Sequence, residues 1–233
     1  MSTTNIPPAQ HELDALQTYL TPTYYLDSDH PEVGALVKRA IGDATDPIER
    51  AVRLYYAVRD GFLYDPYSIE FTPEAFKAST IIARGRGFCI AKACVLAAAA
   101  RALRIPARLG FADVRNHLAT ERLRSLMGTD IFYYHGYTEL YLESKWVKAT
   151  PAFNIELCRK FGTLPLEFDG RTDSIFHPFD AAGHRHMEYV NDRGTRADVP
   201  FEEIRDAMLR YYPQFSSGVQ PGGDFHAEAD AER

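Results

Sequence analysis

A glycine-marked loop followed at once by a long apolar run constrains the fold of this chain more than any other stretch. Residues 81–89 read IIARGRGFC, and residues 90–103 read IAKACVLAAAARAL. Alanine and leucine are the strongest helix formers, and little polar surface interrupts them. The sequence therefore predicts a long, mostly buried helix that begins at or beside Cys89.

The position of Cys89 at a helix start makes it a candidate nucleophile. Unpaired N–H groups and the positive end of the helix dipole favour a thiolate there, and we expect Arg84 and Arg86 to add to this effect. The glycines let the backbone turn sharply and approach a substrate. The alternative is that Cys89 is a small buried hydrophobe, which is the interpretation that we give to Cys94 and Cys158.

Composition narrows the possible functions. The chain has 233 residues, enough for one sizeable core, and a net charge of −6 with no basic stripe that would suggest nucleic acid. No apolar run is free enough of charge to span a membrane, and the start MSTTNIPP does not read as a signal peptide. The three cysteines fit no zinc pattern, so we expect a reducing, cytoplasmic setting.

The rest of the chain reads as a mixture of helices and antiparallel strands. Helices are predicted over residues 31–41, from Asp46-Pro47 to about Gly61, and over residues 201–212. Strands are predicted over residues 104–113, 131–142 and 146–150, the last two as an antiparallel hairpin. We expect one domain over residues 1–215, with its core at about 46–154. Residues 216–233 are acidic and glycine-rich, and they predict a disordered tail.

His135 leads the best strand signal and lies 46 residues after Cys89. A catalytic cysteine needs a base within hydrogen-bond reach, and that base needs a third group to hold its ring. Cys89 and His135 are therefore a candidate nucleophile–base pair.

Two blocks of this sequence resemble the transglutaminase-like superfamily. Residues 85–89 (GRGFC), the apolar helix and residues 104–108 (RIPAR) look like its nucleophile block. Residues 135–141 (HGYTELY), with the Trp146-Val147 and Thr150-Pro151 pairs, look like its histidine–hairpin block. The resemblance, which covers about residues 46–153, implies a papain-like α+β fold. In such a fold the nucleophile helix packs on an antiparallel β-sheet that carries the histidine and its orienting residue.

The resemblance also implies acyl transfer at an amide, through a thioester on Cys89, with no metal or organic cofactor. His135 would take the thiol proton and later give one to the leaving amine, and the backbone N–H of Cys89 would help to stabilise the oxyanion. Gly87, Phe88 and Glu139 are the candidate substrate-binding residues. For Glu139 a solvated rim position is an equally good interpretation.

Thr150 departs from the family pattern, which commonly has aspartate before the proline that ends the second strand. Threonine cannot stabilise an imidazolium by charge, so either another residue does this or catalysis has been lost. A neutral amide can orient a histidine, as in Cys-His-Asn sites, so we predict that Asn154 matters more than Thr150. If neither acts, Asp169 and Asp173 are the next carboxylates.

The register of the hairpin decides whether these two candidates reach His135. A two-residue turn at Ser144-Lys145 would pair Glu139 with Thr150 and His135 with Asn154, placing both candidates on the histidine's face. If Glu143 also belonged to the turn, the register would move by one residue and both would face away.

Five polar residues in the C-terminal third are candidate metal ligands: His177, His184, His186, Asp180 and Glu188. Their spacing matches no established metal site, and histidines are common in polar loops. We therefore predict no metal.

The function that the sequence favours is a cysteine hydrolase or acyltransferase acting on a peptide, protein or small amide. Protease or amidase activity is at least as strongly indicated as cross-linking, because nothing marks a site for a second amine. One alternative is acyl transfer of the arylamine N-acetyltransferase type, from acetyl-CoA, for which no phosphate-binding feature is visible. Another is a catalytically silent domain that binds a peptide in the same cleft, which the Thr150 departure supports. No nucleic-acid or membrane partner is expected.

Overall fold

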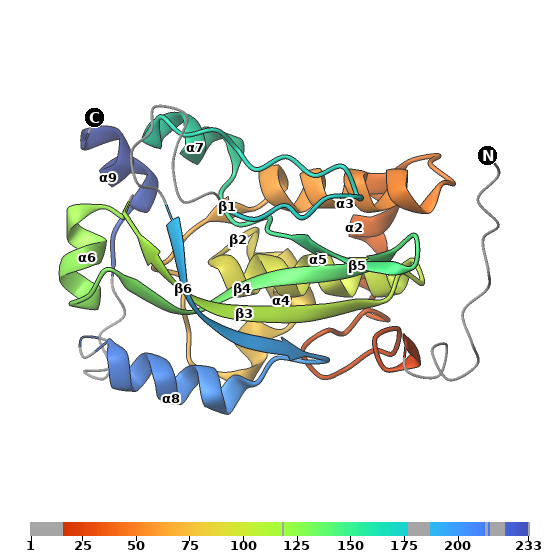
Figure 1. The fold of residues 1–233 in the computed structure, drawn as a ribbon, viewed down its shortest axis with the longest axis horizontal. Coiled ribbons are helices and arrows are strands. Elements are labelled where there is room, and N and C mark those ends of the chain that lie inside the picture. Colours follow the sequence, from red (N-terminus) through yellow and green to blue (C-terminus); the bar gives the residue numbers. More distant parts are fainter. Residues whose placement is uncertain (1–15, 118, 177–186, 213, 215–221, 233) are drawn as a thin grey trace.

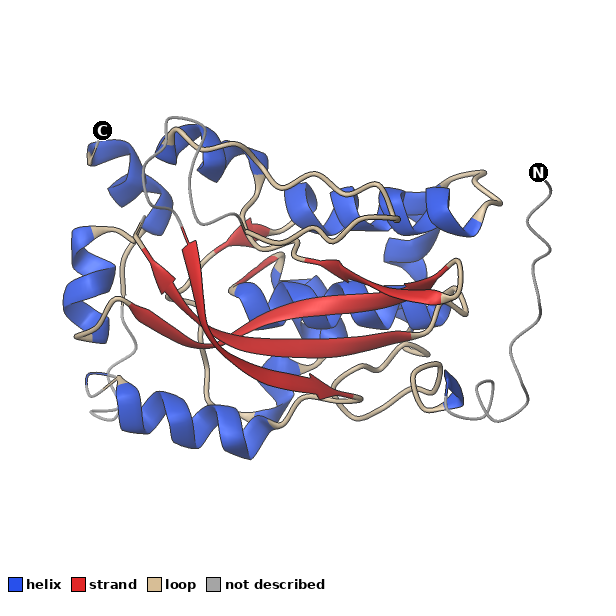
Figure 2. Ribbon diagram, viewed as in Figure 1, coloured by secondary structure: helices blue, strands red, loops and turns tan. Residues whose placement is uncertain are grey.

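The fold is built around an antiparallel sheet with one long helix against its back. The computed structural model describes residues 16–117, 119–176, 187–212, 214 and 222–232. The sheet has the strand order β5-β4-β3-β6, and Figures 1 and 2 show α5 crossing behind it. The predicted α+β class, with a nucleophile helix on an antiparallel sheet, is therefore confirmed.

The strands and helices have the following bounds. The sheet consists of β3 (Ala107–Asn116), β4 (Ile131–Leu142), β5 (Lys145–Ala149) and β6 (Met187–Arg196), while β1 (Leu63–Tyr64) and β2 (Arg86–Gly87) form a short parallel pair. The α-helices are α2 (Pro31–Ile41), α3 (Pro47–Gly61), α4 (Ala78–Arg84), α5 (Cys89–Ala102), α6 (Glu121–Met127), α7 (Ile155–Phe161), α8 (Phe201–Tyr211) and α9 (Phe225–Ala231), with a 3₁₀ turn over Pro73–Phe76.

The helix starts confirm the capping signals in the sequence. The Asp46 side chain accepts a hydrogen bond from the N–H of Glu49 at 2.9 Å, and Pro47 takes the first helical position of α3. Helix α2 covers the predicted residues 31–41. Both helices pack against α5 (Figure 1) and so help to enclose it.

Helix α5 is buried on all sides, as its composition predicted. Its one lysine, Lys92, is fully buried and donates to the carbonyl oxygens of Arg59 at 2.8 Å and Phe62 at 2.7 Å. Burial lowers the pKa of Lys92 to about 7. Because the two acceptors lie at the end of α3, Lys92 ties that helix end to α5 close to Cys89.

A glycine lets the start of α5 sit directly on β4. A Cβ at Gly136 would lie 2.9 Å from the Cα of Ile90, closer than side-chain carbons approach. Two residues on, the hydroxyl of Thr138 donates to the carbonyl of Ala93 at 2.9 Å. Gly136 and Thr138 therefore hold the first turns of α5 against the middle of the sheet.

The hairpin register differs from both predicted registers. Leu142 pairs with Lys145, so the turn residues are Glu143 and Ser144, with φ of 48° and 65°. Two left-handed residues are typical of the type I′ turn, which usually contains asparagine or glycine. Glu143 and Ser144 are neither, so this turn has no local sequence signal. The last pair of the ladder joins Thr138 to Ala149.

Strand β6 was not predicted. It pairs antiparallel with β3 at the edge of the sheet, and most of its residues are exposed or half-buried. Its sequence, MEYVNDRGTR, lacks the apolar alternation of a strand with one buried face. The prediction of a disordered C-terminal tail is wrong for residues 222–232, where α9 forms and buries Phe225 and Ala229. Phe225 anchors the helix in the core, and polar contacts such as that of Glu228 with the Tyr67 hydroxyl at 2.6 Å hold its outer side.

Candidate active site

Cys89 is the first residue of α5, and its side chain is only 7% exposed. Burial raises the pKa of the Cys89 thiol to about 11, although the backbone N–H groups of Gly136, Ile90 and Cys89 itself point toward the sulfur and oppose the rise. The expectation of a resting thiolate is therefore wrong, because desolvation of the charged sulfur outweighs the helix start.

The two arginines of the preceding loop do not support the thiol either. Arg84 donates to the carbonyl of Ser68 and pairs with Glu70 at 2.9 Å, while Arg86 pairs with Asp65 at 3.6 Å. Each positive charge therefore already has an acidic partner of its own. Their predicted contribution to Cys89 is not found.

His135 comes from β4 and is 3% exposed. Burial lowers the pKa of His135 to about 4, and no other influence on it is resolved. Its ring packs against Phe176, with the ring centres 5.7 Å apart. Its Nε2 atom is buried and has no hydrogen-bond partner among the described residues. At neutral pH His135 is therefore an uncharged base.

Cys89 and His135 line the same apolar pocket. Its walls come from the loop after β1, from α6, from the start of β4 and from the end of α8: Tyr64, Pro66, Ile69, Phe88, Leu123, Met127, Phe132, Tyr133, Met208 and Tyr212. The cavity volume is about 40 Å³, room for very few water molecules. In this state the pocket is closed to a peptide.

No hydrogen bond joins the Cys89 sulfur to the His135 ring within the described structure. Hydrogen bonds between catalytic groups are often long in a free enzyme and tighten only when the substrate binds. The structure thus brings the predicted pair into one pocket in an unengaged, uncharged state.

Neither predicted orienting residue is bonded to His135. The Oδ1 atom of Asn154 accepts the backbone N–H of Tyr64 at 3.1 Å, which holds the loop before α7 to β1. The Thr150 hydroxyl is buried without a partner among the described residues. Sheet alternation puts Thr150 next to the Thr138–Ala149 pair and on the histidine's face of the sheet, whereas Asn154 lies beyond the ladder.

Asp169 and Asp173, the next candidates for orienting His135, form hydrogen bonds with other residues. Asp169 accepts the N–H groups of Arg171 at 2.8 Å and Thr172 at 2.7 Å, and so closes its own turn. Asp173 accepts the N–H of Lys148 at 2.9 Å, which fastens its loop to the exposed edge of β5. Neither serves as a partner for His135.

Only one of the three predicted substrate-binding residues lines the pocket that contains Cys89 and His135. Phe88 lines the pocket. Gly87 does not; a Cβ there would lie 2.6 Å from the Cβ of Ala91, so packing accounts for this glycine. Glu139 is buried in an ion pair with Arg108 at 2.6 Å and is not among the pocket residues, which does not favour its predicted role.

Sequence reasoning missed the tyrosines around the sulfur. The pKa values of Tyr64 and Tyr212 are raised, first by burial and also by Cys89. The Tyr212 hydroxyl accepts the N–H of Tyr133 at 2.7 Å and donates to the carbonyl of Ile131 at 3.2 Å. These residues lie 25 positions before and 123 after Cys89, so no local pattern connects them to it.

Within the parts of the chain that the structure describes, no group of three or more His, Cys, Asp or Glu side chains could hold a metal ion. His177, His184, His186 and Asp180 lie outside the described residues. Glu188 pairs with Arg115 and with His117.

A cysteine at the start of a buried helix and a histidine on the adjoining antiparallel sheet define a cysteine-enzyme type of α+β fold. The family follows from the comparison of sequences: the chain belongs to the transglutaminase-like superfamily, whose family model matches residues 34–151. The matched segment contains Cys89, His135 and Thr150.

One solved structure is similar to this chain, that of a protein named as a putative cysteine protease from Cytophaga hutchinsonii. The identity is 18% and the TM-score 0.46, and the match covers 78% of this chain and 54% of that one. The chain thus spans about half the length of that protein. A search of curated proteins gave no match. Among the described residues, no helix has the length and apolar character needed to cross a membrane.

Proposed function

We propose that this protein is a cysteine hydrolase or acyltransferase that acts on an amide bond of a peptide, protein or small amide. The observation that carries the proposal is the shared pocket of Cys89 and His135, with backbone N–H groups directed toward the sulfur. Hydrolysis is at least as strongly indicated as cross-linking, because nothing in the sequence marks a site for a second amine.

The protonation states define the first chemical step. At neutral pH Cys89 is a thiol and His135 is a neutral imidazole, so the resting site carries no net charge. His135 then takes the thiol proton as the sulfur attacks the carbonyl carbon, acting as a general base. The same proton goes to the departing amine, which leaves a thioester on Cys89. Water, or a second amine, attacks the thioester and releases the acyl group.

Substrate entry requires the pocket to open. The cavity of about 40 Å³ cannot hold a peptide bond with its flanking groups. Three large side chains from α6 and α8 line this cavity: Leu123, Met127 and Met208. We infer that a peptide substrate displaces these side chains before the thiol attacks it.

A catalytically silent peptide-binding domain is the second candidate. Two observations favour it: no charged partner raises the pKa of His135, and Thr150 stands where the family commonly has aspartate. Without that charge the imidazolium formed after proton transfer is poorly stabilised. The cytoplasmic setting stays a prediction; all three cysteines are free, as a reducing compartment would leave them.

The test combines thiol labelling with a turnover screen. A limiting amount of iodoacetamide should modify Cys89 before Cys94 and Cys158, because Cys89 lines a pocket and is the most exposed of the three thiols. In a screen of fluorogenic peptide and small amide substrates, Cys89→Ala and His135→Gln should each abolish turnover, while Cys158→Ala keeps it. Preferential labelling of Cys158 would contradict the site. Peptide binding that survives in Cys89→Ala, with no turnover in the native chain, would favour the silent domain.

A further inference from the structure

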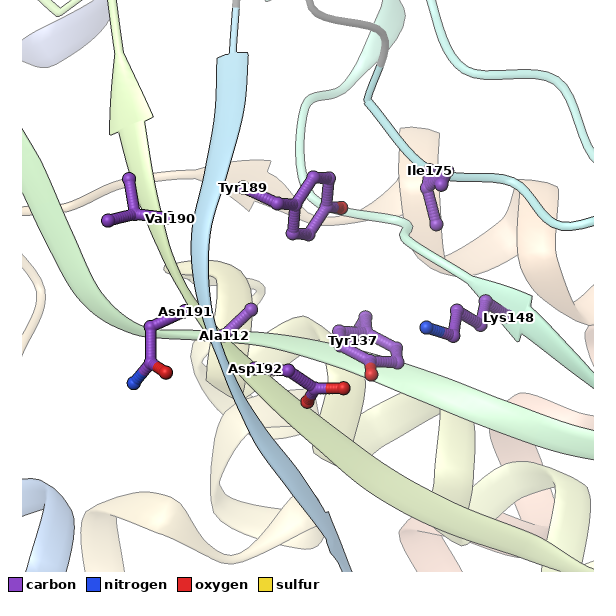
Figure 3. Close-up of a pocket in the computed structure, with 8 residues that line it drawn as sticks. All are labelled: Ala112, Tyr137, Lys148, Ile175, Tyr189, Val190, Asn191 and Asp192. Atoms are coloured by element: carbon purple, nitrogen blue, oxygen red, sulfur yellow. The ribbon is translucent and has the colours of Figure 1, made fainter.

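A second, more open pocket lies on the face of the sheet opposite to α5 (Figure 3), with a volume of about 250 Å³. Gly136 and Thr138 contact α5, so the alternation of side chains along β4 turns Tyr137 to the opposite face. The lining residues come from all four strands and the loop before β6: Ala112, Tyr137, Lys148, Ile175, Tyr189, Val190, Asn191 and Asp192. Pockets for drug-sized ligands are usually larger, so this one suits a small molecule.

The floor of the pocket is the ring of Tyr137. It lies over Gly110, its partner on β3: a Cβ at Gly110 would come within 2.2 Å of the ring atoms. Gly110 therefore makes the space into which the ring fits, and the ring presents its outer face to the pocket. An aromatic floor of this kind attracts cations and apolar groups.

Two opposite charges reach this floor from different sides. The Lys148 ammonium lies 5.1 Å from the centre of the Tyr137 ring, and Asp192 stands on the other side of that ring in Figure 3. Within the described residues neither side chain forms an ion pair. One Asp192 oxygen accepts the N–H of Gly194 at 2.8 Å, and the other has no hydrogen-bond partner among the residues that the structure describes. A cation and an anion held apart across an aromatic ring match a ligand that carries both charges.

The pocket adjoins the candidate active site. Ala112, one of its lining residues, is the β3 partner of His135. The Tyr189 hydroxyl is hydrogen-bonded to the backbone of Phe176, whose ring packs against His135. Although 40% of Tyr189 is exposed, its partial burial raises its pKa, the Phe176 backbone opposes this rise, and Cys89 adds to it. The small-molecule pocket and the catalytic pair therefore share a wall.

We propose that this pocket binds a small zwitterion, of the size of an amino acid or dipeptide. This ligand corresponds to the amine side of the substrate, the part that is released as an amine when the amide bond is broken. The ligand's carboxylate pairs with Lys148, its ammonium pairs with Asp192, and its body lies on Tyr137. Assigning the ligand to the amine side of the reaction rests on the proposed function, whereas binding itself does not.

Binding is measured by isothermal titration in the full chain carrying Cys89→Ala, so that no turnover interferes. The probes are L-phenylalanine, L-phenylalaninamide, which lacks the carboxylate, and N-acetyl-L-phenylalanine, which lacks the ammonium. The zwitterion should bind about tenfold more tightly than either capped probe, since each lost charge-assisted hydrogen bond is worth about that factor.

Two charge-removing variants identify the partners. Lys148→Met should abolish the preference for the acid over the amide and keep the preference for the free amine, and Asp192→Asn should do the reverse. Lys145→Met, an exposed lysine on the same strand and outside the pocket, is the matched control and should change nothing. Equal affinities for the three probes, no binding of any probe, or preferences that survive both variants would each overturn the inference.

The outcome is separable from the proposed function. Zwitterion binding in a protein whose native chain shows no turnover would sustain the pocket and refute the hydrolase. Turnover that depends on Cys89 but is unaffected by Lys148→Met and Asp192→Asn would sustain the hydrolase and refute the amine-side assignment.

Discussion

Replacing Thr150 by aspartate should restore the charge that His135 lacks. Thr150 follows the last hairpin pair and lies on the histidine's face of the sheet, and both its hydroxyl and His135 Nε2 are buried without partners among the described residues. A carboxylate beside a histidine favours the imidazolium. Thr150→Asp is therefore expected to raise the pKa of His135, with consequences for stability and for Cys89 reactivity.

The magnitude follows from the burial of the ring. Burial lowers the pKa of His135 from 6.5 to about 4, a cost of about 3 kcal/mol for the charged form at 1.36 kcal/mol per pKa unit. An opposite charge within reach typically returns about 1–3 units. We therefore expect a pKa of about 5–7 for His135 in the variant.

The same shift predicts a pH dependence of stability. In the native chain the folded pKa of His135 lies below the unfolded value, so the unfolded state takes up the proton first and stability falls as the pH drops from 6.5 to about 4. The loss approaches about 3 kcal/mol. In Thr150→Asp this acid loss should shrink, while at pH 8, where His135 is neutral, the buried carboxylate should lower the free energy of unfolding.

The assay is a titration of the His135 ring by NMR, together with urea unfolding at several pH values and the rate of Cys89 alkylation. Thr150→Asn is the matched control, since it has the shape of aspartate without its charge and should leave the His135 pKa within about one unit. A folded Thr150→Asp protein with an unchanged His135 pKa would refute the reasoning, because it would mean that the two side chains do not face each other.

Two further predictions concern packing. Gly136→Ala should destabilise the fold by about 1–3 kcal/mol through overpacking, because the new Cβ would lie 2.9 Å from the Ile90 backbone. Gly34→Ala in α2 is the control: a Cβ there would have nothing within 4 Å, so this variant should be neutral or more stable. Equal free energies of unfolding for the two variants would contradict this reasoning. Phe225→Ala should cost about 3–5 kcal/mol, because Phe225 is buried among Tyr64, Tyr67 and Phe161. An unchanged melting temperature would mean that α9 is not docked in solution.

Local patterns in the sequence were sufficient to predict the helices and the strand at the centre of the fold. The Asp46-Pro47 cap placed the start of α3, and the apolar run after Cys89 specified a helix that is buried on all sides. The aromatic and β-branched residues of β4 marked the strand that carries His135. These signals depend on neighbours within one or two turns, which is why they could be interpreted without the fold.

The electrostatics of the site depended on tertiary structure. The sequence shows that Cys89 begins a helix, but only the packing of α6, α8 and β4 around it shows that desolvation raises the pKa of its thiol. The hairpin register depends on a turn at Glu143 and Ser144, which both have positive φ although neither residue type is typical of such a turn. Strand β6 and helix α9 are held by partners far away in the chain, on β3 and around Tyr64. Burial and long-range pairing are properties of the whole fold, because each depends on atoms that the local sequence does not contain.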